Sequence, residues 1–240
     1  MKVRSPKNNR LRIAGLSIFS LALAVLVYPA IPESSRPDLS ISTIAHAKEG
    51  IRIPAPARPI TEPAGTLTAV FAGGCFWGIE GVFERVNGVV SVESGYSGGK
   101  QSTAKYGPVS DGLTAHAESV RIRYNPNEVS YNQLLHIFFS VTHDPTQLNR
   151  QGPDTGKQYR TAIFPANGAQ RGAAQAYITQ LGKARIWNAP IVTRIEPYSF
   201  FAAETYHQDY MRKNPNSGYI KAYDKPKVAN LKKLFPSIYR

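Results

Sequence analysis

Residues 67–78 have the sequence LTAVFAGGCFWG, in which a short apolar run leads through two glycines to a cysteine and two aromatic residues. The apolar run, Leu67 to Ala72, is typical of a buried strand. Apolar residues after it recur at the spacing of an amphipathic helix (Ile79, Val82, Phe83, Val86). Cys75 therefore falls at a strand-to-helix turn, where the flanking glycines allow a sharp bend and the close approach of a substrate.

Cys75 is the only cysteine of the chain. Unpaired backbone N–H groups and the helix dipole stabilise negative charge at a helix N-terminus. This position predicts a thiol pKa below the free value of about 8.5, and hence a nucleophilic thiolate. The alternative is a buried, inert cysteine that packs as a small apolar residue. A lone thiol forms neither an internal disulfide nor a CxxC pair, and it argues against a thiolate zinc site.

The composition is that of an ordinary globular protein, with 42% hydrophobic and 10% aromatic residues among 240. The formal net charge is +13, and residues 1–47, with six Lys or Arg and two Asp or Glu, contribute +4 and leave +9 for the remainder. The later charges are scattered, apart from loose clusters near the C-terminus. Because no basic stripe alternates with aromatic residues, we expect solvated surface charge and no nucleic-acid partner.

The N-terminus resembles a targeting segment. Five basic residues precede an uncharged apolar stretch from Ile13 to Ile31, and an Ala-x-Ala site occurs at Ala45-His46-Ala47. Residues 1–47 are therefore predicted to be a signal peptide or an N-terminal membrane anchor, with cleavage left open. In either case residues 48–240 are expected to be exported, periplasmic or otherwise extracytoplasmic. Residues 48–66 continue a Pro-, Ser- and Ala-rich stretch and are predicted to be a linker.

Residues 67–240 are predicted to form one catalytic domain of the α+β class. Its leading elements alternate in the order strand, helix, strand, strand, helix, strand, which is the plan of a two-layer ferredoxin-like sandwich. We expect a mixed sheet and a long, partly irregular C-terminal extension. The predicted elements after the first helix are strands at 89–96, 117–124, 159–164 and 191–195 and helices after Ser130 and at 169–181, the former begun by a Ser130–Gln133 capping box.

Glu118 lies in an alternating segment, Ala117 to Tyr124. The alternation puts Glu118 on the same face as three apolar or aromatic residues, so it points toward the core or a pocket. Desolvation there would raise its pKa and keep it protonated near neutral pH, as a general acid requires. A one-residue shift of the strand would instead leave Glu118 at an exposed end, and the pattern alone does not decide between the two.

Several ordered motifs together resemble the A-type peptide methionine sulfoxide reductases. The matching segments span roughly residues 67–219. They include Gly73–Gly78, Gly95–Gly99, Tyr106, His116–Glu118, Thr142–Pro145, Asp154, Gln158–Arg160, Ala203–Gln208 and Lys213–Pro215. The resemblance implies reduction of the S-epimer of methionine sulfoxide, free or in oxidised proteins, and so protein repair.

The resemblance also implies roles for individual residues. Cys75 would attack the sulfoxide sulfur and Glu118 would protonate its oxygen. Tyr106 and Tyr159 would donate hydrogen bonds to that oxygen, and Asp154 would contribute polarity or position the reductant. An apolar pocket for the S-methyl group would be lined by Phe76 and Trp77. No metal and no cofactor is implied, and we expect a monomer.

The chain departs from many members of that family because residues 198–240 contain no cysteine. The sulfenic acid left on Cys75 must therefore meet an external thiol, either a small thiol or a thioredoxin- or glutaredoxin-like protein. Two other functions stay open: a cysteine hydrolase with a histidine base, and a module that binds oxidised methionine without reducing it. His143-Asp144-Pro145 is typical of a metal site only in isolation, and a capping or turn role is favoured.

Overall fold

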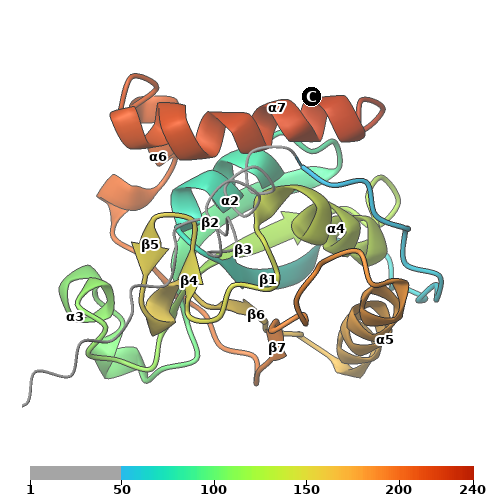
Figure 1. Ribbon diagram of the computed structural model, residues 1–240, viewed down its shortest axis with the longest axis horizontal. Helices are drawn as coiled ribbons and strands as arrows, with labels where there is room; N and C mark the ends of the chain where they lie inside the picture. The colour runs from blue at the N-terminus through green and yellow to red at the C-terminus, as the bar shows by residue number, and fades with distance from the viewer. Residues whose placement is uncertain (1–49) are drawn as a thin grey trace, which may run out of the picture. The chain divides into compact units, whose positions relative to one another are not determined.

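The central sheet of the computed structural model, which describes residues 50–240, has six strands in the order β7-β6-β1-β3-β2-β8 (Figure 1). Neighbouring strands are antiparallel except β6 and β7, which are parallel, so the sheet is mixed. The strands are β1 (Leu67–Gly73), β2 (Val89–Ser97), β3 (Ala117–Tyr124), β6 (Thr161–Ile163), β7 (Arg194–Ile195) and β8 (Phe201–Ala202). A separate two-stranded ribbon pairs β4 (Arg150–Gln151) with β5 (Asp154–Thr155).

The helices fall between and after these strands. They are α2 (Phe76–Phe83), α3 (Tyr106–Ser110), α4 (Tyr131–Ile137), α5 (Gly168–Ala184), α6 (Tyr210–Lys213) and α7 (Lys225–Leu234). The predicted capping box begins α4, because the Ser130 hydroxyl accepts from the Gln133 N–H and the Gln133 side chain accepts from the Ser130 N–H. The last predicted strand is shorter than expected, since β7 contains two residues only.

Phe71 of β1 shows how the two layers pack. Its ring lies 5.9 Å from that of Phe83 in α2, 5.9 Å from Tyr131 in α4 and 4.8 Å from Phe138 just beyond α4. Helices α2 and α4 therefore cover the same face of the sheet. With the strand order β6-β1-β3-β2, this is the predicted ferredoxin-like sandwich. Helix α7 lies across the outer side of α2, and the chain ends beside it (Figure 1).

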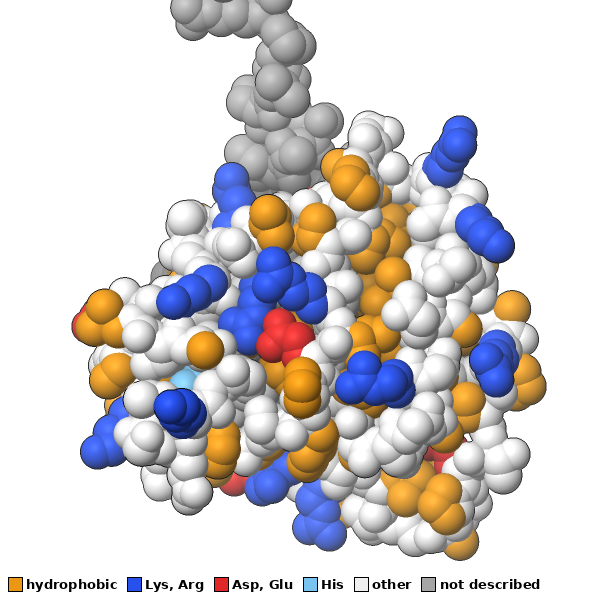
Figure 2. All heavy atoms as spheres, turned by 90° about the horizontal axis from the view of Figure 1, so that it is seen from below, with side chains coloured by type: hydrophobic (Ala, Val, Ile, Leu, Met, Phe, Trp, Pro, Cys, Tyr) orange, Lys and Arg blue, Asp and Glu red, His pale blue; other side chains and the backbone are white. Residues whose placement is uncertain are grey.

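The other face of the sheet has a smaller apolar cluster of its own. Val70, Ala72, Ala117, Ala162 and Phe164 are buried there beneath Phe200, from the extension that follows β7. This cover explains why both faces of β3 are buried at its beginning. Figure 2 shows the underside of the view in Figure 1, where Lys and Arg side chains are mostly spread among uncharged ones.

Residues 50–66, called here the N-terminal strap, contain no helix or strand. The strap is nevertheless fastened to the helical layer. The Pro54 carbonyl accepts from the Tyr177 hydroxyl at 2.9 Å, and Glu62 accepts from the Tyr124 hydroxyl and the Tyr131 N–H. The packed domain thus begins before residue 67, because these bonds hold the segment that the sequence predicted to be a linker.

The predicted signal or anchor, residues 1–47, lies outside the described residues. Across residues 50–240, no helix combines the length and the apolar character needed to cross a membrane.

Candidate active site

Cys75 lies between the end of β1 and the first turn of α2, at the predicted strand-to-helix turn. The preceding residue, Gly74, has a φ of +98°, and a Cβ there would lie 2.6 Å from the Gln151 side chain. Both the positive φ and the lack of space for a Cβ require glycine at this position. The turn holds the thiol in the interior, since Cys75 is only 7% exposed.

The predicted low pKa of Cys75 is wrong for this structure. Burial raises the pKa of the thiol well above its usual value, and the nearby Glu118 and Asp224 carboxylates raise it further. The Trp77 N–H in the first turn of α2 and the Lys227 ammonium lower it, but they do not prevail. The helix N-terminus does lower the pKa of the thiol, as the sequence predicted, but desolvation raises it by more.

Glu118 is 2% exposed, so it occupies the buried position, one of the two alternatives that the pattern left open. Its Oε2 atom accepts the Phe76 N–H at 3.1 Å, and Phe76 follows Cys75 directly. Burial raises the pKa of Glu118 to about 8, with Asp154 and Asp224 adding to the rise and the Phe76 N–H opposing it. The carboxyl group is therefore largely protonated at neutral pH and is able to donate a proton.

Tyr106 and Tyr159 lie close to the same groups. Tyr106 is the first residue of α3, and Tyr159 ends a short turn before β6. Burial, followed by Glu118, raises the pKa of both phenols, and Cys75 and Asp154 contribute to each. Both phenols stay protonated and able to donate hydrogen bonds.

Asp154 begins β5 and accepts a hydrogen bond from the Tyr219 hydroxyl. Burial raises the pKa of Asp154, while Tyr219 and the Lys227 ammonium lower it. The structure thus brings the predicted nucleophile, acid, two phenols and second carboxyl group into one neighbourhood, from five separate segments of the chain.

The two aromatic residues after Cys75 form an apolar wall. Phe76 is fully buried, and its ring packs 5.1 Å from His207 and 5.9 Å from Tyr96. Trp77 is partly exposed, stacks on Tyr210 at 3.7 Å, and donates its indole N–H to His207 at 3.3 Å. Part of the wall therefore comes from the C-terminal extension.

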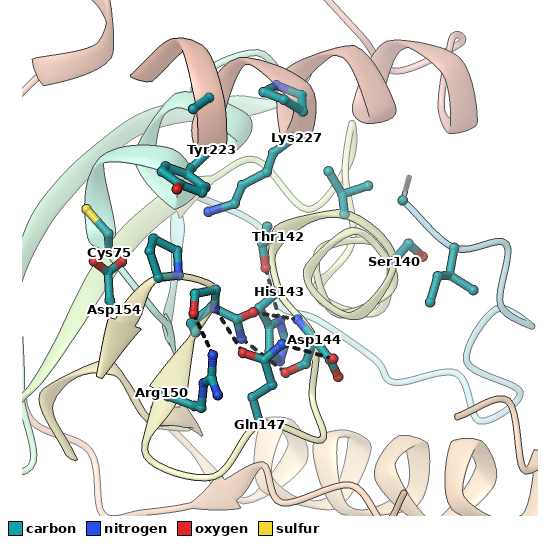
Figure 3. Close-up of a pocket in the computed structure, with 18 of the residues that line it drawn as sticks. Cys75, Ser140, Thr142, His143, Asp144, Gln147, Arg150, Asp154, Tyr223 and Lys227 are labelled. Atoms are coloured by element: carbon teal, nitrogen blue, oxygen red, sulfur yellow. Dashed lines mark hydrogen bonds between the residues drawn. The ribbon is translucent and has the colours of Figure 1, made fainter. Parts of the chain in front are cut away.

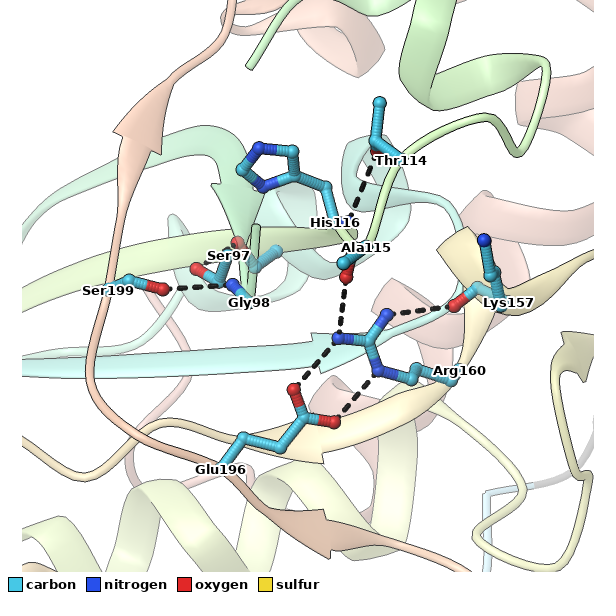
Figure 4. A network of polar contacts seen from close by, with 10 residues as sticks. Ser97, Gly98, Thr114, Ala115, His116, Lys157, Arg160, Glu196 and Ser199 are labelled. Atoms are coloured by element: carbon cyan, nitrogen blue, oxygen red, sulfur yellow. Dashed lines mark hydrogen bonds and ion pairs between the residues drawn. The ribbon is translucent and has the colours of Figure 1, made fainter. Parts of the chain in front are cut away.

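Arg160 braces the segments that carry Tyr159 and Glu118 (Figure 4). Its guanidinium donates two hydrogen bonds to Glu196, at 2.9 and 2.8 Å, and one to the Ala115 carbonyl at 3.1 Å. Because Ala115 lies just before β3 and Glu196 just after β7, one side chain links the start of the strand that carries Glu118 to the end of β7.

Several residues near the site were not predicted to have a role. Glu204 accepts from the Tyr106 N–H at 2.9 Å and from the Tyr96 hydroxyl at 2.8 Å, so it fixes the start of α3. Glu204 belongs to one of the segments that resemble the family, but the resemblance implied no role for it.

Three more residues near the site are marked even less clearly by the sequence: Asp224, Lys227 and Tyr219. Asp224 is fully buried and pairs with Lys227 at 3.2 Å, a spacing of three residues that the sequence displays without marking it as special. A Cβ at Gly78 would clash with Asp224. The close approach at Gly78 is therefore made by this carboxylate and not by a substrate.

No histidine that the structure describes forms a nucleophile–base pair with Cys75. Among residues 50–240, no hydrogen bond joins Cys75 to a histidine, and His143 is engaged with Phe138 and Thr161. Asp144 accepts from the Thr146 N–H at 2.9 Å, which is the turn role favoured by the sequence. Within the same residues, no cluster of His, Cys, Asp and Glu could hold a metal ion.

Comparisons with known proteins bear on the family of the chain. The family model described as "Peptide methionine sulfoxide reductase" matches residues 67–237. The chain is 56% identical over 176 residues to peptide methionine sulfoxide reductase MsrA 2 of Mesorhizobium japonicum, covering 73% of this chain and 90% of that one. It is 50% identical over 177 residues to MsrA of Deinococcus radiodurans, covering 73% and 85%.

Two solved structures are similar as well. Reduced Mxr1 from Saccharomyces cerevisiae has a TM-score of 0.58 at 34% identity and covers 68% of this chain and 94% of that one. Methionine sulfoxide reductase A of Corynebacterium diphtheriae has a TM-score of 0.55 at 33% identity, covering 71% and 88%.

Proposed function

The chain belongs to the peptide methionine sulfoxide reductase family, and we propose that Cys75 and Glu118 carry out the reduction as nucleophile and general acid on the S-epimer. The enzyme reduces methionine sulfoxide to methionine and so repairs oxidised proteins. The observation that carries the proposed roles is the Phe76 N–H to Glu118 bond, since it holds a buried, protonated carboxyl group beside the nucleophile.

A sulfoxide is reduced when its oxygen is protonated while a soft nucleophile attacks its sulfur. Glu118 donates its proton to the sulfoxide oxygen, which Tyr106 and Tyr159 also hold by hydrogen bonds. Cys75 attacks the sulfur, and the proton lost by its thiol restores Glu118. The bond from the substrate sulfur to its protonated oxygen and the transient bond between the two sulfurs then break as the oxygen moves to the Cys75 sulfur. Methionine leaves as the thioether, and Cys75 is left as a sulfenic acid, oxidised by the two electrons that reduce the sulfoxide.

The raised pKa of Cys75 fits this order of events. The thiol and the Glu118 carboxyl group are both protonated at rest, because burial raises the pKa of each, and a charge on Glu118 would raise the pKa of the thiol further. The nucleophile forms as the sulfoxide accepts the Glu118 proton. The apolar wall of Phe76 and Trp77 receives the S-methyl group of the substrate.

Regeneration requires a reductant from outside the chain, because Cys75 is its only cysteine. A first external thiol displaces the sulfenic oxygen as water and forms a mixed disulfide, and a second thiol releases Cys75. Both small thiols and thioredoxin- or glutaredoxin-like proteins are chemically competent for these steps.

The test is turnover of the two sulfoxide epimers by the purified domain, first with dithiothreitol and then with thioredoxin alone. Only the S-epimer is expected to be reduced, and Cys75→Ser is expected to abolish turnover. Equal or preferred turnover of the R-epimer would contradict the stereochemical assignment. A Cys75→Ser variant that keeps turnover would contradict the role of the thiol.

The apolar N-terminal stretch and its basic flank support a place of action outside the cytoplasm. The domain would be released by cleavage or held by a membrane anchor, and it would act as a monomer. Fractionation of cells that produce the full chain distinguishes the outcomes: a periplasmic or membrane fraction is expected, whereas a cytoplasmic full-length chain would contradict export.

A further inference from the structure

A cavity of about 380 Å³ opens beside Cys75 (Figure 3). Cys75, Asp154 and Tyr219 are part of its lining. The lining also includes residues from the beginning of the N-terminal strap, from the π-helical turn Phe138–Thr142 and the segment after it, from β4, and from the start of α7 and the segment before it. Glu118, Tyr106, Tyr159 and the aromatic wall are not part of this lining. The cavity therefore reaches the nucleophile by a side other than the one where the sulfoxide oxygen is held.

The charged groups of the cavity differ in how fully they are paired. The Asp144 carboxylate already accepts from the Thr146 N–H, the Thr146 hydroxyl and the Gln147 amide, and Asp154 accepts from Tyr219. Lys227 makes a single hydrogen bond among the described residues, to Asp224 at 3.2 Å, although an ammonium has three donors.

The Lys227 side chain also points toward the part of the cavity that adjoins Cys75. Its side chain is 11% exposed, and in Figure 3 its ammonium extends between Tyr223 and Thr142 into the space in front of Cys75. Arg150 lies at the exposed rim of the same cavity. The cavity thus offers an incoming molecule the two free donors of Lys227, beyond its pair with Asp224, and the guanidinium of Arg150, which also donates to the Gly152 carbonyl. Of the carboxylates in the lining, Asp144 accepts three hydrogen bonds and Asp154 one.

We propose that this cavity is the entry site for a low-molecular-mass anionic thiol that regenerates Cys75, with Lys227 binding the anionic group. The proposal rests on the proposed function, because it needs the sulfenic acid that sulfoxide reduction leaves on Cys75. The volume suits a small molecule. A buried sulfur at the end of a cavity is also more accessible to a small thiol than to a cysteine on a protein surface.

The chemistry of divalent sulfur favours this direction of approach. A thiolate attacks a sulfenic sulfur from the side opposite the departing oxygen, and that oxygen is delivered on the side of Glu118. The first thiol forms the S–S bond as the S–O bond breaks, and the oxygen leaves as water after taking up two protons in all. The second thiol attacks the mixed disulfide, so two thiols become one disulfide and Cys75 regains its electrons.

The experiment compares thiols that differ in charge as reductants of the full domain: mercaptoacetate as the anionic thiol and 2-mercaptoethanol as the neutral one, at equal thiolate concentrations. Lys227→Gln is expected to lower kcat/KM for mercaptoacetate by about tenfold or more, the size expected when one charge-assisted hydrogen bond is lost. The value for 2-mercaptoethanol should change much less, and Lys227→Arg should restore selectivity for the anion in part.

The matched control is Lys221→Gln, which removes one charge from an exposed position outside the cavity lining. It should change neither value, and so it separates Lys227 from general attraction of anions by a basic protein. Arg150→Gln, at the rim, provides a second variant with the same selective loss if Lys227→Gln does not fold.

Equal losses for both thiols in Lys227→Gln and in Arg150→Gln, or the same loss in Lys221→Gln, would overturn the proposal. Methionine formed by each protein without any thiol is measured first. If none forms, the proposed function fails. If it forms and the charge of the thiol has no effect, only the entry site is wrong.

Discussion

The Phe76 N–H donates to Glu118 Oε2 at 3.1 Å, so the carboxyl group on β3 is hydrogen-bonded to the residue that directly follows the nucleophile. The donor is in the first turn of α2, where N–H groups have no partner within the helix. One bond therefore satisfies one of the unpaired N–H groups of α2 and holds the acid next to the residue that follows the nucleophile. Tertiary structure, rather than local sequence, creates this pair, since 42 positions separate the two residues.

Replacing Glu118 by Gln tests its role as the acid. The amide fits the same space and still accepts the Phe76 N–H, so the variant should fold. The single-turnover rate of sulfoxide reduction should fall by roughly 10²- to 10⁴-fold, which is the usual size of general acid–base catalysis. Glu93→Gln, on β2 and paired with Arg121 away from the site, is the matched control and should leave the rate unchanged. A near-normal rate in Glu118→Gln would mean that the proton comes from another group.

The rate of sulfoxide reduction should depend on pH through the same residue. Because burial raises the pKa of Glu118 to about 8, its protonated form is lost as the pH rises through that value. The single-turnover rate is expected to be flat below about pH 7 and to fall above pH 8, approaching tenfold per pH unit. Stopped-flow measurements of wild type and Glu118→Gln provide the check: the fall should be absent from the variant. A rate that rises through pH 8 would show that thiolate formation, and not the acid, limits the reaction.

Stability should depend on Glu118 as well. Its pKa is about 8 in the folded protein against an ordinary value of 4.5, so the folded state binds the proton more tightly. The contribution of protonated Glu118 to the free energy of unfolding is fully present below about pH 4.5 and is lost as the pH rises to about 8. Relative to Glu118→Gln, the free energy of unfolding of the wild type should therefore decline across this window. Urea unfolding at several pH values measures it, and a constant difference between the two proteins would contradict the raised pKa.

Much of the fold follows from periodicity. Alternation predicted β3 to its end residues, and a helical spacing with a polar cap predicted α4, because burial of one face imposes these patterns. The short helix α3 and the ribbon β4–β5 have no such pattern, since they are held by side chains from distant segments. The pKa of Cys75 could not be predicted for the same reason. Local sequence reveals a helix N-terminus, but it reveals neither the burial of the thiol nor the nearby carboxylates of Glu118, from β3, and Asp224, from the C-terminal extension.

The N-terminal strap should contribute to stability, unlike a flexible linker. Glu62 accepts hydrogen bonds from the Tyr124 hydroxyl at 2.6 Å and the Tyr131 N–H at 2.9 Å, the latter in the first turn of α4. Glu62→Ala removes both and should lower the free energy of unfolding by about 1–3 kcal/mol. Thermal or urea unfolding measures the change, with the exposed neighbour Thr61→Ala as a control that should have little effect. Equal stability of the two variants would show that the strap is only loosely attached.

The most direct test of the central claim is the amount of methionine formed per enzyme when the purified domain meets the S-epimer without any reductant. Cys75 is the only thiol, so the reaction should stop after one methionine per enzyme. Mass spectrometry should then find one added oxygen on Cys75, as a sulfenic acid that dimedone traps. Two methionines per enzyme, or methionine formed while Cys75 stays unmodified, would contradict the single-thiol mechanism.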